Sequence, residues 1–243
     1  MIKLVVTDID GCLTMGGAAK LPLRLFETLQ EWNECAAENP RVPAITICTG
    51  RPQPYAEAII QGIGCEQPAI CESGGILYEL QNRTLLINPL FDHELEKKYL
   101  LLSERVKEQF LDGTRPIFLE PGKYTELTII PYDILTVDDI WEETLEFVES
   151  YNDTFEVSRT RYVVNFSPCV ISKGVGVRWL AEKTGIDCSE MAGFGDAIPD
   201  IAFLREVGFS GCPANAFPEV KESCDFVSAS EFGDGLLEFL EQI

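Results

Sequence analysis

The 243-residue sequence predicts an α/β fold, a doubly wound and mostly parallel sheet with a smaller α+β domain inserted into it. Short apolar runs alternate with helical patterns in the first and last thirds of the chain, which is typical of β-α-β units. The middle third has a different order, in which each of two helical patterns is followed by two strand patterns. A chain of this length can bury a large core as one domain or as two.

The first third predicts three strands separated by two helices. An apolar run that starts at Val5 predicts the first strand, and Pro22 can open the helix that follows. Leu25 and Leu29 recur in that helix at the spacing of one buried face. The remaining elements of this part are expected as a strand, a helix and a strand over residues 44–48, 55–62 and 68–71.

The last third returns to the same alternation. A helical pattern starts at Ser172 and ends at Gly185, a residue type that commonly ends helices. Strands are expected after it over 191–195, 208–211 and 226–228, with a helix over 198–205 and helical segments up to Leu240. We therefore assign residues 1–83 and 163–243 to one parallel-sheet domain.

The middle of the chain, residues 84–162, is the expected inserted domain. Asp92 is placed to cap its first helix, and Thr136 with Asp139 forms the pattern of a capping box before its second. The strands expected after the two helices cover 117–120, 126–130, 155–158 and 162–166. The resulting order is α-β-β-α-β-β, typical of an antiparallel α+β unit.

Charge limits the partners that the chain can have. The sequence contains 19 basic and 40 acidic residues, a net charge of −21, so nucleic acids and anionic membranes are unfavourable partners. A small anionic substrate is compatible with this charge, because salt screens distant charges over about 8 Å. Such a substrate needs a cation close by.

Cysteine usage and the start of the chain predict a cytoplasmic protein. The nine cysteines are odd in number and include no C-x-x-C pair, which favours reduced thiols over a disulfide or zinc framework. The N-terminus leads directly into a strand, so we expect no signal peptide. No apolar run approaches the roughly 18 residues of a membrane span.

Two aspartates at the end of the first strand are the main candidates for chemistry. Asp8 and Asp10 follow the apolar run and precede Gly11. They lie where a strand ends and the chain turns, at the edge where open α/β sheets bind their ligands. The alternative interpretation is an acidic loop without a function.

Further polar residues follow other strand ends or begin helices. They are Thr49, Gly50 and Arg51, then Lys173, then Asp196 and Asp200. Each has a structural alternative, as a helix cap or a solvated first-turn residue. Together their chemistry is coherent, because converging carboxylates repel one another unless a divalent cation with oxygen ligands, such as Mg²⁺, lies among them. A lysine and a hydroxyl beside such a cation suit a phosphate group.

The combined pattern resembles the haloacid dehalogenase-like phosphatase superfamily. The motifs are D-x-D-G-x-x-T over 8–14, T-G-R over 49–51, Lys173, and G-D-x-x-x-D over 195–200. The insert lies between the second motif and the lysine, and its element order resembles the cap of subclass IIB. That group includes sugar-phosphate phosphatases, archaeal-type phosphoglycolate phosphatases and phosphomannomutases. Ser73 and Pro199 stand where this group often has asparagine. The resemblance implies a Rossmann-like core with a small cap domain.

The resemblance also implies a role for each acidic residue. Asp8 would be the nucleophile that forms an aspartyl-phosphate, and Asp10 would be the general acid and base. Mg²⁺ would be held by the carboxylates of Asp8 and Asp196 and by the backbone carbonyl of Asp10. Asp200 would support the metal or orient Lys173.

The remaining motif residues would bind the substrate. Thr49 and Lys173 are expected to hold the phosphoryl oxygens, and Gly50 and Arg51 belong to the same substrate-binding segment. The sequence leaves two roles open for Arg51, contact with the phosphate or pairing with a carboxylate.

We expect Mg²⁺-dependent hydrolysis of a small phosphorylated metabolite, a sugar phosphate or a phosphoglycolate-like acid. A phosphomutase would use the same site, although its insert tends to be larger in this group. A phospho-acceptor signalling domain resembling response-regulator receivers is shorter and carries its aspartate on a later strand. An inactive binding protein is disfavoured because every catalytic residue is retained. The sequence does not predict the oligomeric state.

Overall fold

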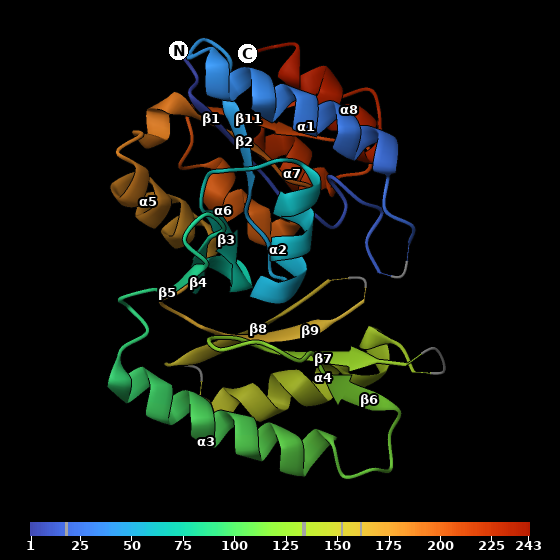
Figure 1. The fold of residues 1–243 in the computed structure, drawn as a ribbon. Helices are drawn as coiled ribbons and strands as arrows, with labels where there is room; N and C mark the ends of the chain where they lie inside the picture. The colour runs from blue at the N-terminus through green and yellow to red at the C-terminus, as the bar shows by residue number, and fades with distance from the viewer. Residues whose placement is uncertain (18, 133–134, 152, 161) are drawn as a thin grey trace. The chain divides into compact units, whose positions relative to one another are not determined.

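The computed structural model describes residues 1–17, 19–132, 135–151, 153–160 and 162–243, which form two compact units (Figure 1). The first comprises Met1–Leu86 with Ser172–Ile243, and the second is Ile87–Ile171. Among the described residues, no helix is long and apolar enough to cross a membrane.

A five-stranded sheet of parallel strands forms the centre of the first unit, in the order β12-β11-β10-β1-β2. These strands are β1 (Leu4–Thr7), β2 (Ala44–Ile47), β10 (Met191–Phe194), β11 (Phe209–Cys212) and β12 (Phe226–Val227). In the register of the sheet, Leu4 pairs with Ala44 on one side and with Met191 on the other. After β1 the chain adds β2 on one side of it, and the later strands β10, β11 and β12 are added on the other side. The strand order therefore reverses at β1. Open sheets bind ligands at this type of switch point.

Helices cover both faces of this sheet, so its strands are apolar on both sides. Val5 packs with α1 (Leu23–Glu38), α2 (Gln53–Gly62) and α8 (Phe232–Leu240). Its neighbours Leu4 and Val6 point to the other face and pack with α5, α6 and α7. These last helices span Lys173–Thr184, Ile201–Leu204 and Pro218–Ser223. The predicted doubly wound α/β fold is confirmed.

One part of the first unit differs from the expected alternation. The strand expected at 68–71 is β3 (Ala69–Cys71), which is continued by β4 (Ile76–Glu79) and β5 (Thr84–Ile87) in a separate three-stranded sheet. β3 pairs with β4 in antiparallel fashion. The β4–β5 hairpin was not predicted, because its strands carry no strict alternation of apolar and polar residues.

The second unit has the predicted α-β-β-α-β-β order. Its elements are α3 (His93–Phe110), β6 (Ile117–Leu119), β7 (Leu127–Pro131), α4 (Val137–Val148), β8 (Phe155–Arg159) and β9 (Val164–Pro168). The strands form an antiparallel sheet in the order β6-β7-β9-β8. Asp92 Oδ1 accepts a hydrogen bond from the Leu95 amide at 2.9 Å, and the Thr136 amide donates to Asp139 at 2.6 Å, so both predicted caps are present.

The sequence predicts the insert at 84–162, whereas the compact unit spans 87–171. The far boundary lies later because β9 pairs with both β7 and β8 and so belongs to the sheet of the insert. Among the residues that the structure describes there are also four short 3₁₀ helices, η1 (Glu72–Gly74), η2 (Glu149–Tyr151), η3 (Cys188–Glu190) and η4 (Ile198–Asp200).

Candidate active site

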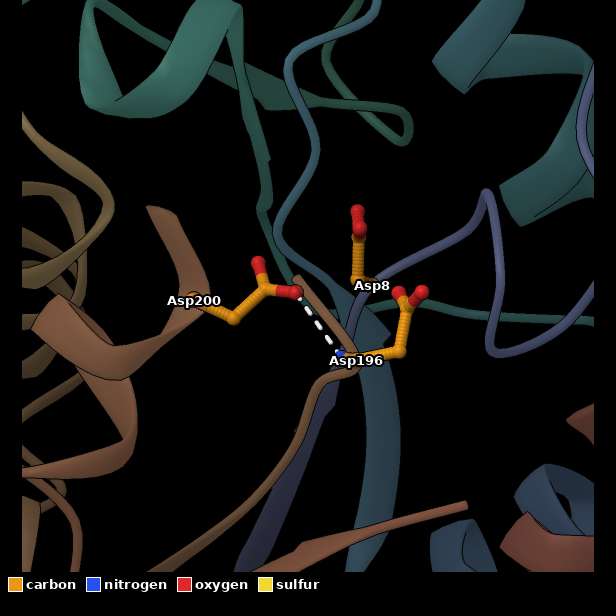
Figure 2. Close-up of side chains that lie close together, drawn as sticks. All are labelled: Asp8, Asp196 and Asp200. Atoms are coloured by element: carbon orange, nitrogen blue, oxygen red, sulfur yellow. Dashed lines mark hydrogen bonds between the residues drawn. The ribbon is translucent and has the colours of Figure 1, made fainter. Parts of the chain in front are cut away.

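The acidic residues of the motifs meet at the carboxyl ends of β1 and β10, the two central strands. Asp8 directly follows β1, and its amide donates to the Phe194 carbonyl at 2.9 Å. Asp196 lies just beyond β10, and Asp200 ends the short helix η4. Figure 2 shows the three carboxylates lying close together. One oxygen from each lies within 4.8 Å of the others.

A buried lysine joins two of these carboxylates. Lys173 is the first residue of α5, and its Nζ lies 3.0 Å from Asp8 Oδ1 and 2.5 Å from Asp200 Oδ1. Lys173, Asp8 and Asp200 are 5%, 6% and 0% exposed. Because water is excluded from this cluster, its charges interact more strongly than they would at the surface.

Asp200 organises the cluster by hydrogen bonds. Its Oδ2 accepts from the amides of Asp196 and Ala197, both at 2.9 Å, and the first of these bonds is drawn in Figure 2. Its Oδ1 accepts from Lys173. Both Asp200 oxygens are therefore engaged, which favours a role in orienting Lys173 and the Asp196 turn.

The electrostatics of the cluster favour an additional cation. Burial, opposed by the nearby Lys173 ammonium, raises the pKa of Asp8 to about 7. Burial and the charges of Asp200 and Asp8 raise the pKa of Asp196 to about 8. Burial acts to lower the pKa of Lys173, but the two carboxylates outweigh it and raise that pKa well above its usual value. One lysine thus leaves negative charge uncompensated, and a donor set of oxygens alone fits a hard divalent cation such as Mg²⁺.

These shifts predict how pH and Mg²⁺ affect stability. The pKa values of Asp8 and Asp196 rise from 3.8 when unfolded to about 7 and 8 when folded. Between about pH 4 and pH 8 these two carboxyl groups bind more protons in the folded protein than in the unfolded one. The free energy of unfolding of the metal-free protein therefore falls as pH rises through this range. Mg²⁺ should therefore raise the melting temperature more at about pH 8 than at about pH 6. Thermal unfolding with excess chelator or excess Mg²⁺ measures this, and equal shifts at both pH values would contradict it.

Asp10 lies outside the carboxylate cluster and pairs with Arg51. Arg51 Nε is 2.6 Å from Asp10 Oδ2, and Nη2 is 3.2 Å from Oδ1, a two-pronged contact. The guanidinium also lies over the Tyr55 ring, 5.0 Å from its centroid. Of the two roles left open for Arg51, the structure has the pairing with a carboxylate.

Thr49 lies beside the end of β1. The Cys48 amide donates to the Thr7 carbonyl at 2.8 Å, so Thr49 follows the end of β2, the strand that pairs with β1. Its Oγ1 accepts from the Arg51 amide at 3.1 Å, and the side chain is 1% exposed. A hydroxyl that accepts such a bond can still donate its own proton to a phosphate oxygen. Gly50 connects Thr49 to Arg51 in the same turn.

Two contacts of this site were not anticipated from the sequence. Cys12 Sγ donates to Asp196 Oδ1 at 3.6 Å, and Asn215 Nδ2 donates to the Gly11 carbonyl at 2.9 Å. Gly11 has a φ of +95°, and a Cβ on it would lie 2.1 Å from Asp196 Oδ2, so only glycine fits there. The glycine after Asp10 was the one signal available, whereas Asn215 has no local pattern.

Comparison with known proteins identifies the family. Residues 5–115 and 120–240 match the family model of the haloacid dehalogenase-like hydrolases. The chain belongs to this family. As a haloacid dehalogenase-like hydrolase it is an enzyme, as the sequence predicted.

Curated relatives match this hydrolase along almost their whole length. It is 29% identical to a phosphoglycolate phosphatase of Methanopyrus kandleri, with 100% of this chain and 97% of the relative covered. It is 28% identical to a phosphoglycolate phosphatase of Methanosarcina mazei, with coverage of 98% and 95%.

Solved structures share the fold of this hydrolase. A protein of Thermoplasma acidophilum, numbered 0175, has a TM-score of 0.76 at 18% identity, with both chains covered completely. A haloacid dehalogenase-like hydrolase of Bacteroides thetaiotaomicron also has a TM-score of 0.76, at 17% identity, with 100% and 99% covered. These similarities agree with the predicted fold class.

Proposed function

We propose that this haloacid dehalogenase-like phosphatase hydrolyses the phosphate monoester of a small metabolite, with Mg²⁺ bound and with Asp8 as the nucleophile. The observation that carries the proposal is the buried cluster in which Asp8 lies 3.0 Å from the Lys173 ammonium and within 4.8 Å of an oxygen of Asp196. A carboxylate held beside a fixed positive charge suits attack on an anionic phosphate, because the lysine offsets the repulsion between them.

In the first step, an oxygen of the Asp8 carboxylate forms a bond to phosphorus. The bond between phosphorus and the ester oxygen breaks, and Asp10 gives its proton to the departing oxygen. Lys173 and the Thr49 hydroxyl donate to the phosphoryl oxygens. The product of this step is a phosphoryl group on Asp8 and a released alcohol.

In the second step, water attacks the phosphorus of the aspartyl-phosphate. Asp10, now a carboxylate, takes a proton from that water. The bond between phosphorus and the Asp8 oxygen breaks, which releases inorganic phosphate and restores the Asp8 carboxylate. Asp10 is then protonated for the next cycle.

We assign the metal site to the carboxylates of Asp8 and Asp196 and to the backbone carbonyl of Asp10, with Asp200 acting indirectly through Lys173 and the Asp196 turn. A bound Mg²⁺ supplies a positive charge that neutralises phosphoryl oxygens and keeps Asp8 ionised. The raised pKa values of Asp8 and Asp196 support this assignment, because they mark a site that is short of positive charge.

The relatives named phosphoglycolate phosphatases support a phosphoglycolate-like acid as the substrate, and a sugar phosphate is the second candidate. A panel of phosphoglycolate, several sugar phosphates and a generic aryl phosphate, assayed for phosphate release with Mg²⁺, tests the proposal. We expect kcat/KM to be highest for one small metabolite. Absence of release from every member would contradict the proposed function.

The Arg51–Asp10 pair predicts an effect that depends on the leaving group. Removing the guanidinium in Arg51→Met should leave Asp10 poorly placed to donate its proton. Alkyl phosphates need that proton in the first step, so their kcat/KM should fall by roughly 100-fold. The kcat/KM of nitrophenyl phosphate, whose leaving group departs as an anion, should fall much less, because kcat/KM reports only the steps up to release of the alcohol. Steady-state kinetics on both substrates measure the difference. Equal losses would mean that Arg51 does not act through Asp10.

A further inference from the structure

The loop after β11 runs beside both of the turns that carry the acidic residues. Asn215 Nδ2 donates to the Gly11 carbonyl at 2.9 Å, and the Phe217 amide donates to the Asp196 carbonyl at 2.9 Å. The Asn215 side chain thus contacts a residue 204 positions away in the chain. The nucleophile turn and the Asp196 turn share this support.

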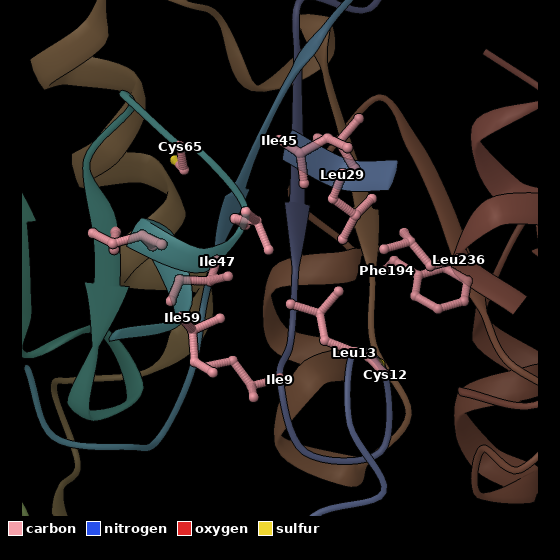
Figure 3. Packing of buried hydrophobic residues seen from close by; sticks show 14 of the residues in the cluster. Ile9, Cys12, Leu13, Leu29, Ile45, Ile47, Ile59, Cys65, Phe194 and Leu236 are labelled. Carbon is pink, nitrogen blue, oxygen red and sulfur yellow. The ribbon is translucent and has the colours of Figure 1, made fainter. Parts of the chain in front are cut away.

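Most of the nucleophile turn is fixed by its own side chains and amides. Ile9, Cys12 and Leu13 are buried in the same hydrophobic cluster as Phe194 and Leu236, part of which is drawn in Figure 3. The Gly11 amide donates to the Thr14 carbonyl at 2.7 Å. The Gly11 carbonyl, by contrast, is held from outside the turn, by Asn215.

Asn215 is itself held in one orientation. Its Oδ1 accepts from the amide of Phe232, the first residue of α8, at 2.8 Å. The nitrogen of the side-chain amide therefore faces the Gly11 carbonyl, and its oxygen faces the Phe232 N–H. A flipped amide would lose both bonds, so the donor toward Gly11 is fixed by the fold.

A small movement of the Gly11 peptide would disturb the proposed metal site. Gly11 lies against the Asp196 carboxylate, closely enough that a Cβ would overlap it. The peptide before Gly11 carries the Asp10 carbonyl, which the proposed function assigns to the metal. Rotation of the Gly11 backbone would therefore displace the Asp10 carbonyl and, at the same time, the Asp196 carboxylate that it contacts.

We propose that Asn215 is a positioning residue for the metal, which fixes the Gly11 peptide so that the Asp10 carbonyl and the Asp196 carboxylate keep their mutual orientation. This inference rests on the proposed metal-dependent function. Groups that orient metal ligands without touching the metal typically contribute about 10- to 100-fold in affinity.

Asn215→Ala removes the bond to Gly11 without adding a charge, and Asn33→Ala is its matched control. Asn33 makes the same kind of bridge in the same unit, because its Nδ2 donates to the Ile63 carbonyl at 2.8 Å and its Oδ1 accepts from the Ile45 amide at 2.8 Å. It joins α1 to β2 and to the end of α2, outside the acidic cluster. Both variants should lose stability, and only Asn215→Ala should lose metal affinity.

Mn²⁺ binding to wild-type and variant protein, measured from the electron paramagnetic resonance signal of free Mn²⁺, tests the inference directly. We expect Asn215→Ala to raise the Kd by about 10- to 100-fold and Asn33→Ala to leave it unchanged. Raising the metal concentration should recover most of the kcat of Asn215→Ala. If Asn215→Ala does not unfold cooperatively, Asn215→Ser is the second variant.

A wild-type Kd in a folded Asn215 variant would overturn this inference and leave the proposed function standing. If wild-type protein bound no Mn²⁺, the metal assignment itself would be wrong, and this inference would fall with it. An equal loss of affinity in Asn33→Ala would reduce Asn215 to a general structural role.

Discussion

Asp8→Asn should abolish phosphate release while the protein remains folded. An asparagine amide is too weak a nucleophile to attack phosphorus, so turnover should fall by roughly 10⁴-fold or more, as it does when other covalent hydrolases lose their nucleophile. Phosphate release from the best substrate of the panel measures this loss.

The melting temperature of the Asp8→Asn variant shows whether a loss of turnover comes from unfolding. Burial raises the pKa of Asp8, so the charged form destabilises the metal-free fold at about pH 8. Asp8→Asn in chelator should therefore melt no lower than the wild-type protein. Near-wild-type turnover by a folded Asp8→Asn variant would contradict the covalent mechanism.

Removal of the metal should have an effect of similar size. Excess chelator should eliminate activity, and Mg²⁺ should restore it, because the converging carboxylates of Asp8 and Asp196 otherwise repel the phosphate. Ca²⁺ should restore activity poorly, since its longer bonds and looser coordination would misplace Asp8 relative to phosphorus.

Phosphate release in chelator, followed by titration with each cation, measures the metal requirement. The protein should remain folded in chelator, which thermal unfolding verifies. Full activity with excess chelator would remove the metal from the mechanism, together with the roles assigned to Asp196 and to the Asp10 carbonyl.

Local sequence patterns predict the parts of this fold that depend on interactions between residues close together in the chain. Alternating strand and helix patterns indicated the parallel sheet, and the capping residues Asp92 and Thr136 marked the starts of α3 and α4 correctly. The β4–β5 hairpin escaped prediction because its turn includes Arg83, which has a φ of +50° and is not a typical residue for that conformation. Three of the four β4 residues are buried in the fold, so tertiary packing outweighs the weak local signal there.

In the candidate site, too, local patterns predicted some residues, whereas other contacts could not be predicted. The acidic residues and Lys173 were identified because each ends a strand or begins a helix, and the structure brings Asp8, Asp196, Asp200 and Lys173 together. The partner of Arg51 was undetermined, because a guanidinium suits a phosphate and a carboxylate equally well.

Asn215 had no signal at all in the sequence. An asparagine that follows Pro213-Ala214 is typical of an ordinary loop. Its bond to Gly11 depends on the packing of β11, β10 and β1 side by side. A contact of this kind can be read only from the assembled sheet.

The identity of the phosphorylated residue tests the covalent mechanism most directly. Asp10→Asn lacks the base for the second step, so with nitrophenyl phosphate, whose leaving group needs no proton, it should accumulate the intermediate. Acid quenching followed by mass spectrometry of peptides should then find one phosphoryl group on Asp8, and none in the Asp8→Asn, Asp10→Asn double variant. Phosphoryl transfer to another residue, or phosphate release with no phosphorylated enzyme at any time, would contradict the account.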